Sequence, residues 1–499
     1  MSKQESKLPS RPLCSSTVDP SAWRNYWDAL KYTRCEELSI DATRQAELES
    51  YRSISPNIEQ AIYPFKNVRL SRADIRWLLA THENKYESGE ASNENAQSFI
   101  GRGLDLRGAD LRQVDLRGLS LRGLYGGLIW RDWMDATPAQ REAAAVHLEG
   151  ANLYGAHVEG AILNAAHLEG AYLSEVHLKG SELNGAFLEG VDLWRAHLDD
   201  TFLSEAHLEG ANFYKAHLEG VYLYEAHLEG VSLYAAHLEG ADLTKAHLEG
   251  KGVSIEDLER IYKWNEGLPK ILPPADLRRT FFDTSTNLEA ITIGNRSYGF
   301  ISLADALWSN VNLAVVKWSE MKMLGDERQA KEDQTTEGVK KDKKKQLEGY
   351  ENAVRANRQL AVALQTQGLN EDAARFAYRA QKLQRTVARR QGKYGQYLFS
   401  FFLDLLAGYG YRPRRSLLWY FIIILGFAAT HYLFGHLPLL PDALVFSLTS
   451  FHGRGFFPGL GNETSLHNPL VVLAAFEAVV GLLIEISFIA TFTQRFFGK

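Results

Sequence analysis

A period of five residues runs through the middle of this 499-residue chain. From Val146 to Gly250, 105 residues divide without remainder into 21 units such as VHLEG, ANLYG and AHVEG, and the middle residue is Leu in all but two of them. Neither an α-helix, at 3.6 residues per turn, nor a strand, with a period of two, produces this pattern. A coil with four units in each turn does, and it buries the middle Leu and the small residue two positions before it.

The repeat resembles the A-(D/N)-L-x-x pattern of the pentapeptide-repeat family, which implies a right-handed quadrilateral β-helix with turns stacked about 4.8 Å apart. Four further units, LDLRG ADLRQ VDLRG LSLRG, begin at Leu104 and are out of phase with Leu148 onward. We therefore expect residues 124–145 to loop out and to contain a capped helix after Thr137-Pro138. The predicted β-helix covers residues 99–250 and follows an N-terminal helical region at 1–98.

A second period of ten residues lies over the first, because the sequence HLEG recurs in every other unit. Four units per turn place the histidines in two columns on opposite faces. Column one contains His147, His167, His207, His227 and His247, and column two contains His157, His177, His197, His217 and His237. Such columns suit a pH sensor or a metal strip, or they reflect duplication of a unit that carries a surface histidine. We prefer duplication, because flat outward faces fix no coordination geometry, and we predict no metal site and no cofactor.

The repeats are acidic. Residues 146–250 hold 13 Glu and 4 Asp against 3 Lys and 1 Arg, a balance of −13. Some soluble pentapeptide-repeat proteins are similar to a DNA duplex in shape and charge and bind type II topoisomerases, so the resemblance implies an acidic DNA mimic as one alternative. The sequence shows no nucleophile–base pair, phosphate loop or metal-ligand spacing, and it predicts neither an enzyme nor a nucleic-acid-binding protein.

Beyond the repeats the sequence predicts helices and a linker. A capping box at Ser254 opens a helix that would close the β-helix, and one degenerate repeat turn follows at 299–318, both within a segment at 251–320. Because residues 325–348 contain almost no apolar side chains, we expect a mobile linker at 321–348. Residues 349–395 resemble one tetratricopeptide-repeat helix pair joined at Gly368, which must pack on another part of the protein.

Two apolar stretches, 416–434 and 469–493, are long enough to cross a bilayer. A predicted interfacial helix at 396–415 precedes them and ends in Arg412, Arg414 and Arg415, which would contact anionic lipid. The loop between the spans holds a single basic residue, so the positive-inside rule places both termini and the repeat domain in the cytoplasm. We therefore expect a multi-pass protein of the inner (cytoplasmic) membrane.

Between the two spans, Pro441 to His452 forms a predicted helix of 12 residues, too short to cross a membrane, and a glycine-containing loop follows within 441–459. This order resembles the pore-loop fold of potassium-channel-like proteins, which implies a homotetramer. The second span matches that family's E-A-x-x-G…F-I-A pattern. Glu477, Gly481 and Glu485 share one helix face as pore or hinge candidates, and carboxylates at membrane depth require a partner or a water-filled path.

The loop departs from a potassium filter. Aligned from Asp442, the filter T-V-G-Y-G falls on residues 453–457, and Arg454 and Phe457 disfavour potassium selectivity because that filter needs carbonyls pointed inward by glycines. In a fourfold assembly, Arg454 would form an anion-selecting ring or pair with Glu477 and seal the centre. The candidate pore-loop and filter residues are Thr449, His452, Gly453, Arg454, Gly455, Phe456 and Phe457.

Two main functional hypotheses follow. The first is a channel-like membrane protein, not potassium-selective and either anion-conducting or non-conducting, whose cytoplasmic repeat domain senses or scaffolds. The second is a membrane-anchored interaction scaffold without conduction, in which the acidic repeats bind a protein partner. The topoisomerase-binding DNA mimic is a lesser alternative.

Overall fold

The computed structural model describes residues 40–82, 103–252, 271–332, 340–434, 439–453 and 469–496. The chain divides into two compact units, Met1–Leu369 and Asn370–Lys499, called unit one and unit two. Unit one contains the repeats, and unit two is helical.

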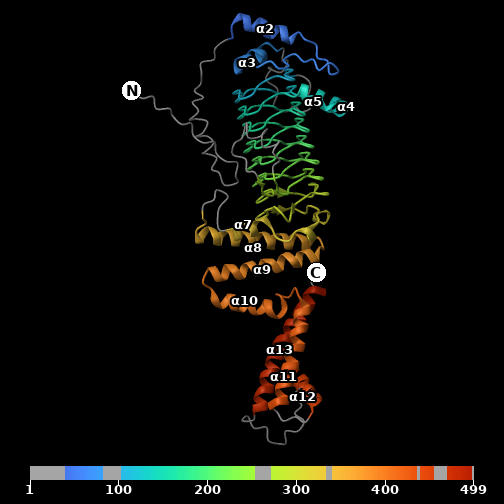
Figure 1. The fold of residues 1–499 in the computed structure, drawn as a ribbon, viewed down its shortest axis with the longest axis vertical. Coiled ribbons are helices and arrows are strands. Elements are labelled where there is room, and N and C mark those ends of the chain that lie inside the picture. Colours follow the sequence, from blue (N-terminus) through green and yellow to red (C-terminus); the bar gives the residue numbers. More distant parts are fainter. Residues whose placement is uncertain are drawn as a thin grey trace, which may run out of the picture. The chain divides into compact units, whose positions relative to one another are not determined.

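Unit one is built around a coil of four-sided turns (Figure 1). Parallel bridges join residues that lie 20 positions apart, as in His147 with His167 and Asn152 with Tyr172. The middle Leu of each unit and the small residue two positions before it are buried, as in the unit of Leu148. The predicted β-helix is therefore confirmed.

The last residue of each unit turns the corner of the coil. Its φ is positive in each unit from Gly150 to Lys245, for example 66° at Gly150 and 57° at Glu205. Glycine adopts this left-handed region without a steric cost, which explains the glycine at the end of HLEG.

A helical insertion interrupts the early turns. It contains α4 (Trp130–Asp135) and α5 (Pro138–Ala144), and Thr137 forms a capping box at the start of α5. The chain then rejoins the coil, since Asp110 pairs with His147. The predicted excursion is confirmed, but it begins later than residue 124, because Tyr125 still pairs with Ile162 in the coil.

Two helices, α2 (Ala42–Arg52) and α3 (Arg72–Thr81), lie at the N-terminal end of the coil (Figure 1). The guanidinium of Arg72 donates to the backbone oxygens of Asp115 and Arg117, which fixes α3 on the first turns. The expected N-terminal helical region is thus helical at α2 and α3, and its residues 1–39 and 83–98 lie outside the described ranges.

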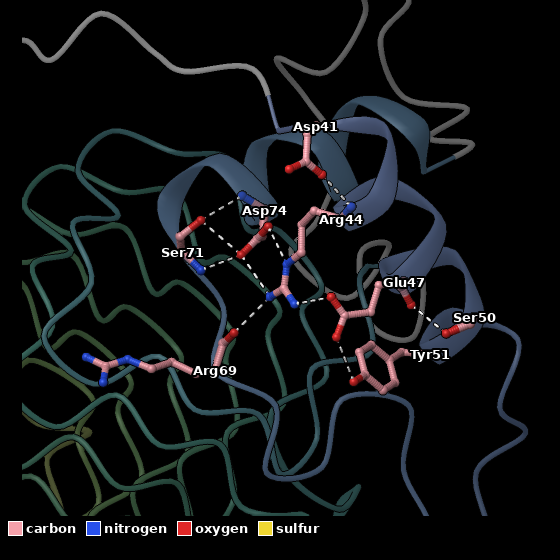
Figure 2. A network of polar contacts seen from close by, with 8 residues as sticks. All are labelled: Asp41, Arg44, Glu47, Ser50, Tyr51, Arg69, Ser71 and Asp74. Atoms are coloured by element: carbon pink, nitrogen blue, oxygen red, sulfur yellow. Dashed lines mark hydrogen bonds and ion pairs between the residues drawn. The ribbon is translucent and has the colours of Figure 1, made fainter.

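Figure 2 shows how Arg44 joins these two helices. Its guanidinium donates to both carboxylate oxygens of Asp74, each at 3.1 Å, and to the backbone oxygen of Arg69 at 3.0 Å. Asp74 also completes the capping box of Ser71. Burial raises the pKa of Asp74, but the hydrogen bonds from Arg44 and Ser71 outweigh it and lower that pKa.

The coil continues for one turn beyond Gly250. Residues 275–293 stack on the preceding turn, and the partial turn expected at 299–318 follows through Ser302. The helix expected at Ser254 lies outside the described residues, so its role as a cap stays a prediction. This turn was not recognised from the sequence because its spacing is uneven: Asn287 follows Phe281 by six positions, whereas the repeat has five. The turn's bridges pair Asp276 with Ser232, Phe281 with His237, Asn287 with Asp242, and Thr292 with His247.

Among the described residues, six short strands accompany this end of the coil: β1 (Lys251–Gly252), β2 (Ile271–Leu272), β3 (Phe281–Phe282), β4 (Gly294–Asn295), β5 (Gly299–Phe300) and β6 (Leu307–Trp308). β1 pairs antiparallel with β2, and β4 with β5, while β3 and β6 are parallel. Two 3-10 helices, η2 (Leu313–Val315) and η3 (Trp318–Glu320), follow.

The predicted mobile linker at 321–348 is wrong over much of its length. Residues Gly325–Lys331 form α7, and a second helix begins at Lys343. The carboxylate of Asp326, on α7, is buried and accepts hydrogen bonds from the backbone nitrogens of Leu303 at 2.6 Å and Ala304 at 3.3 Å. A polar sequence is ordered here because its side chains satisfy backbone groups of the last turn.

The helix α8 (Lys343–Thr366) completes this end. The side-chain oxygens of Gln359 and Gln367 accept from the backbone nitrogens of Asp305 and Leu313, at 2.9 Å and 2.8 Å. This contact fits the expectation that the predicted helix pair packs on another part of the protein. The pairing of its two helices stays a prediction, because the second helix belongs to unit two.

We expect Asp326→Asn to make the thermal stability of unit one depend less on pH. Burial raises the pKa of Asp326 to about 6, although the backbone amides and Arg278 oppose this. The folded state therefore binds this proton more tightly than the unfolded chain, and the contribution to stability falls as pH rises through 6. The thermal midpoint, followed by circular dichroism, should fall from pH 5 to pH 7 more steeply in the wild type than in the variant. Glu320→Gln, an exposed change of the same charge, is the control, and equal slopes in all three proteins would contradict the assignment.

Unit two contains α9 (Asn370–Arg390), α10 (Tyr394–Ala407), α11 (Pro413–Phe434), α12 (Leu440–Phe451) and α13 (Pro469–Phe496). The last three helices pack against one another, and α10 contacts α9, α11 and α13. Ile424, Phe451 and Ile484 form a core where α11, α12 and α13 meet. The predicted half-length helix is present as α12, and α11 and α13 occupy the positions of the two expected spans.

Candidate functional site

The histidines of each column stack ring on ring. Neighbouring rings have centroids 4.6 to 5.3 Å apart and planes within 11° of parallel. Phe187 occupies the column-one position between His167 and His207 and stacks on both. The expected repeat of about 4.8 Å is therefore confirmed.

Each HLEG unit also places a glutamate two residues after its histidine. Nδ1 of His147 lies 3.2 Å from an oxygen of Glu149, and the same contact measures 3.0 Å between His157 and Glu159. The sequence analysis placed these faces outward and did not predict that the glutamates are buried. The available signal was the recurrence of a glutamate at every turn of column one. The buried glutamates of column one are Glu149, Glu169, Glu189, Glu209 and Glu229.

The protonation of individual histidines depends on their neighbours. Burial lowers the pKa of His167, but hydrogen bonds with Glu142 of α5 and with Glu169 outweigh it and raise that pKa to about 10. Burial and the adjacent His157 and His197 lower the pKa of His177, whose unit reads HLKG. The columns therefore combine charged and neutral rings.

We expect His167→Phe to reduce the loss of stability at alkaline pH. The pKa of His167 is raised from about 6.5 to about 10, so its ion pairs stabilise the fold fully below pH 6.5 and are lost as pH rises through 10. The thermal midpoint of the wild type should fall between pH 7 and pH 10, and that of the variant should fall less. Phe187 shows that the column accepts this ring. His217→Phe in column two is the matched control, and a His167→Phe slope equal to that of the wild type would refute the charged assignment.

In unit two, a polar cluster joins α11, α12 and α13. Nε2 of His431 lies 2.9 Å from one oxygen of Glu477, and Oγ of Ser447 donates to the other oxygen. All three side chains are wholly buried. His431 was not identified from the sequence. It could have been found as the single histidine of the first expected span, because the two carboxylates of the second expected span require partners.

The other two residues on this face of α13 also contact α12 or its end. An oxygen of Glu485 lies 3.3 Å from Nε2 of His452. Gly481 lies against Phe451 so closely that a Cβ atom would overlap the backbone oxygen of Phe451. Both carboxylates of the second expected span thus have a histidine of the same chain as partner.

The candidate filter residues are described only in part. Oγ1 of Thr449 donates to the backbone oxygen of Val445 in its own helix, at 3.0 Å, and Gly453 follows α12 with a φ of 65°. Arg454, Gly455, Phe456 and Phe457 lie outside the described residues, so the filter alignment stays a prediction.

Asp404 of α10 connects three helices. Its carboxylate accepts from the hydroxyl of Tyr378 at 2.8 Å, from Arg385 at 2.9 Å and from Arg415 at 3.1 Å. Burial raises the pKa of Asp404, but these hydrogen bonds and charges outweigh it and lower that pKa. The carboxylate therefore fixes the start of α11 on α9 and α10.

The three arginines expected at anionic lipid differ in their surroundings. Arg415 pairs with Asp404, the guanidinium of Arg412 lies 4.4 Å from the ring centre of Tyr378, and Arg414 is exposed. Among the described residues, Arg414–Leu433 is the one helical stretch long and apolar enough to cross a membrane by length and composition.

Comparison with known protein families gives a match within the coil. The pentapeptide-repeat family model matches residues 151–190, 188–223 and 211–250. None of the curated proteins matches the chain.

Three solved structures are similar to the coil. A pentapeptide repeat protein (Rfr23) from the cyanobacterium Cyanothece shares 34% identity, over 24% of this chain and 82% of that one, with a TM-score of 0.20. HetL is a pentapeptide repeat protein involved in heterocyst differentiation regulation in the cyanobacterium Nostoc. It shares 23% identity, over 49% of this chain and 95% of that one, with a TM-score of 0.18. QnrB1, a plasmid-mediated fluoroquinolone resistance protein, shares 16% identity, over 40% of this chain and 77% of that one, with a TM-score of 0.22.

The repeats matched by the family model form the four-sided coil. The chain belongs to the pentapeptide-repeat family, with the repeats matched at residues 151–250.

Proposed function

We propose that this protein is a membrane-anchored scaffold. In this proposal unit two embeds the chain in a lipid bilayer, and the pentapeptide coil binds a protein partner. Neither unit carries out catalysis.

One observation carries the anchoring part of the proposal: α11 and α13 expose many large apolar side chains, while a cluster of polar side chains between α11, α12 and α13 is buried. The cluster of His431, Ser447 and Glu477 has no exposed surface. A water-soluble bundle has the opposite arrangement, and a bundle in lipid needs this one because hydrocarbon cannot solvate polar groups. The exposed side chains include Leu418, Phe421, Leu425 and Leu433 on α11, and Val472, Phe476, Val479, Leu482, Ile486 and Ile489 on α13.

The scaffold part depends on the coil. Its turns form a rigid surface with an excess of acidic residues, which suits a basic protein partner. The DNA-mimic alternative is less well supported, because the glutamates of column one are buried beside histidines and are not displayed as a phosphate backbone is. A supercoiling assay with a type II topoisomerase tests that alternative directly.

Membrane fractionation tests the anchoring. The full chain should stay in the membrane pellet after washing with alkaline carbonate and leave it only in detergent. A chain truncated before Pro413 should be released by the same wash. Release of the full chain by carbonate would refute the anchor.

A channel-like assembly is the second candidate, favoured by the order of helix, 12-residue helix and helix in α11, α12 and α13, which pack together. It predicts a tetramer in detergent and ion flux in liposomes. Potassium, sodium and chloride flux at pH 7.5 and 5.5, beside Arg454→Ala, separates the candidates. Flux whose selectivity depends on Arg454 supports a pore, and a tight membrane with a monomeric protein supports the scaffold.

A further inference from the structure

Three side chains of metal-ligand type meet between two turns of column one. Glu209 belongs to one turn, and His227 and Glu229 belong to the next. One ligand atom from each lies within 4.8 Å of the other two. The glutamates are 7% and 4% exposed.

Each of these side chains has a buried polar atom without a hydrogen-bond partner. The atoms are Oε2 of Glu209, Oε2 of Glu229 and Nδ1 of His227. Nδ1 of His227 is 3.7 Å from the nearest oxygen of Glu229, which is too long for a hydrogen bond. A buried acceptor left unpaired costs about 1–3 kcal/mol. Here three such atoms, all able to donate an electron pair, lie at one place.

Lys251 shows that this pair of glutamates binds positive charge. Its ammonium group lies 2.8 Å from Oε1 of Glu209 and 3.1 Å from Oε1 of Glu229, so it bridges two turns. Lys251 uses only the Oε1 atoms and leaves the Oε2 atoms for a second ligand.

We propose that Glu209, His227 and Glu229 form a binding site for a divalent transition metal, with Zn²⁺ as the reference ion, and that Lys251 weakens its affinity. One imidazole nitrogen and two carboxylate oxygens are ligands that Zn²⁺ accepts, and water can complete a tetrahedron. Burial of the glutamates supplies the fixed geometry that an outward face lacks. The ammonium group of Lys251 repels a metal ion on the neighbouring oxygens, so it acts as an internal competitor.

Groups of the same composition recur in the coil, so the test compares variants and does not depend on the total number of ions bound. The others in column one are Glu149, His167 and Glu169, and Glu189, His207 and Glu209. His167 is a poor ligand because its raised pKa, about 10, keeps it protonated.

Isothermal titration of the full chain in detergent with ZnCl₂ at pH 7.5 tests the site. Glu229→Gln and His227→Phe should each weaken one zinc-binding step at least tenfold. Lys251→Gln should tighten that step about tenfold. Glu205→Gln, an exposed corner residue of the same charge, should titrate as the wild type.

His227→Phe keeps the test decisive if Glu229→Gln fails to fold, because Phe187 shows that the column accepts a phenyl ring. Unchanged zinc binding in His227→Phe, or weaker binding in Lys251→Gln, would overturn the proposal.

Discussion

Replacing Glu477 by leucine is expected to destabilise unit two by about 1–3 kcal/mol, the cost of leaving a buried polar group without its hydrogen-bond partner. Glu477 and His431 are both wholly buried, and their side chains lie 2.9 Å apart. Without the carboxylate, Nε2 of His431 has no partner, and its Nδ1 already has none. Leucine fills most of the volume, so the loss reflects the polar contacts. Unfolding by SDS in mixed micelles, followed by tryptophan fluorescence, measures the change.

Glu485→Leu is the matched control, two turns further along α13. Glu485 also faces a histidine, but this pair is about one-third exposed, at 33% for each side chain. Exposed pairs contribute about 0–1 kcal/mol, so the control should lose little. Equal stability of the two variants would show that the Glu477 cluster is not a buried, paired site.

The Glu477 cluster also bears on function. The sequence allowed this carboxylate a partner or a water-filled path, and the structure provides a partner within the same chain. A carboxylate whose two oxygens are occupied by His431 and Ser447 holds the three helices together. This assignment supports an anchor, and a pore would need to be lined by other groups.

The coil could be predicted because its five-residue period belongs to one architecture. The period gave the column membership of every repeat histidine, and it failed where the spacing changed, between Phe281 and Asn287. A strict five-residue period cannot identify a turn that contains one step of six residues.

The features that the sequence did not reveal depend on contacts between distant segments. Asp326 is in a stretch that composition assigns to a linker, and its burial depends on backbone nitrogens 22 and 23 residues earlier. His431 and Glu477 are 46 residues apart. The burial of the column-one glutamates follows from stacking between turns, which no single unit displays.

Replacing Gly481 by alanine should separate α12 from α13. The added Cβ would overlap the backbone oxygen of Phe451 and lie 3.0 Å from its ring, so neither a rotamer change nor a flexible side chain can relieve the clash. Overpacking of this kind costs about 1–3 kcal/mol, and here it also strains the contacts of Glu477, one turn away on the same helix.

The chain offers a matched control for this prediction in Gly426 of α11, where an added Cβ meets no atom within 4 Å. Gly426→Ala should leave stability unchanged or raise it by up to about 1 kcal/mol, because alanine favours a helix over glycine. Both variants add one methyl group to an apolar helix of the same unit, so a difference between them isolates the contact with Phe451. If Gly481→Ala matched Gly426→Ala in SDS unfolding, the close packing of α12 on α13 would be wrong, and Gly481 would be free to act as the hinge that the sequence suggested.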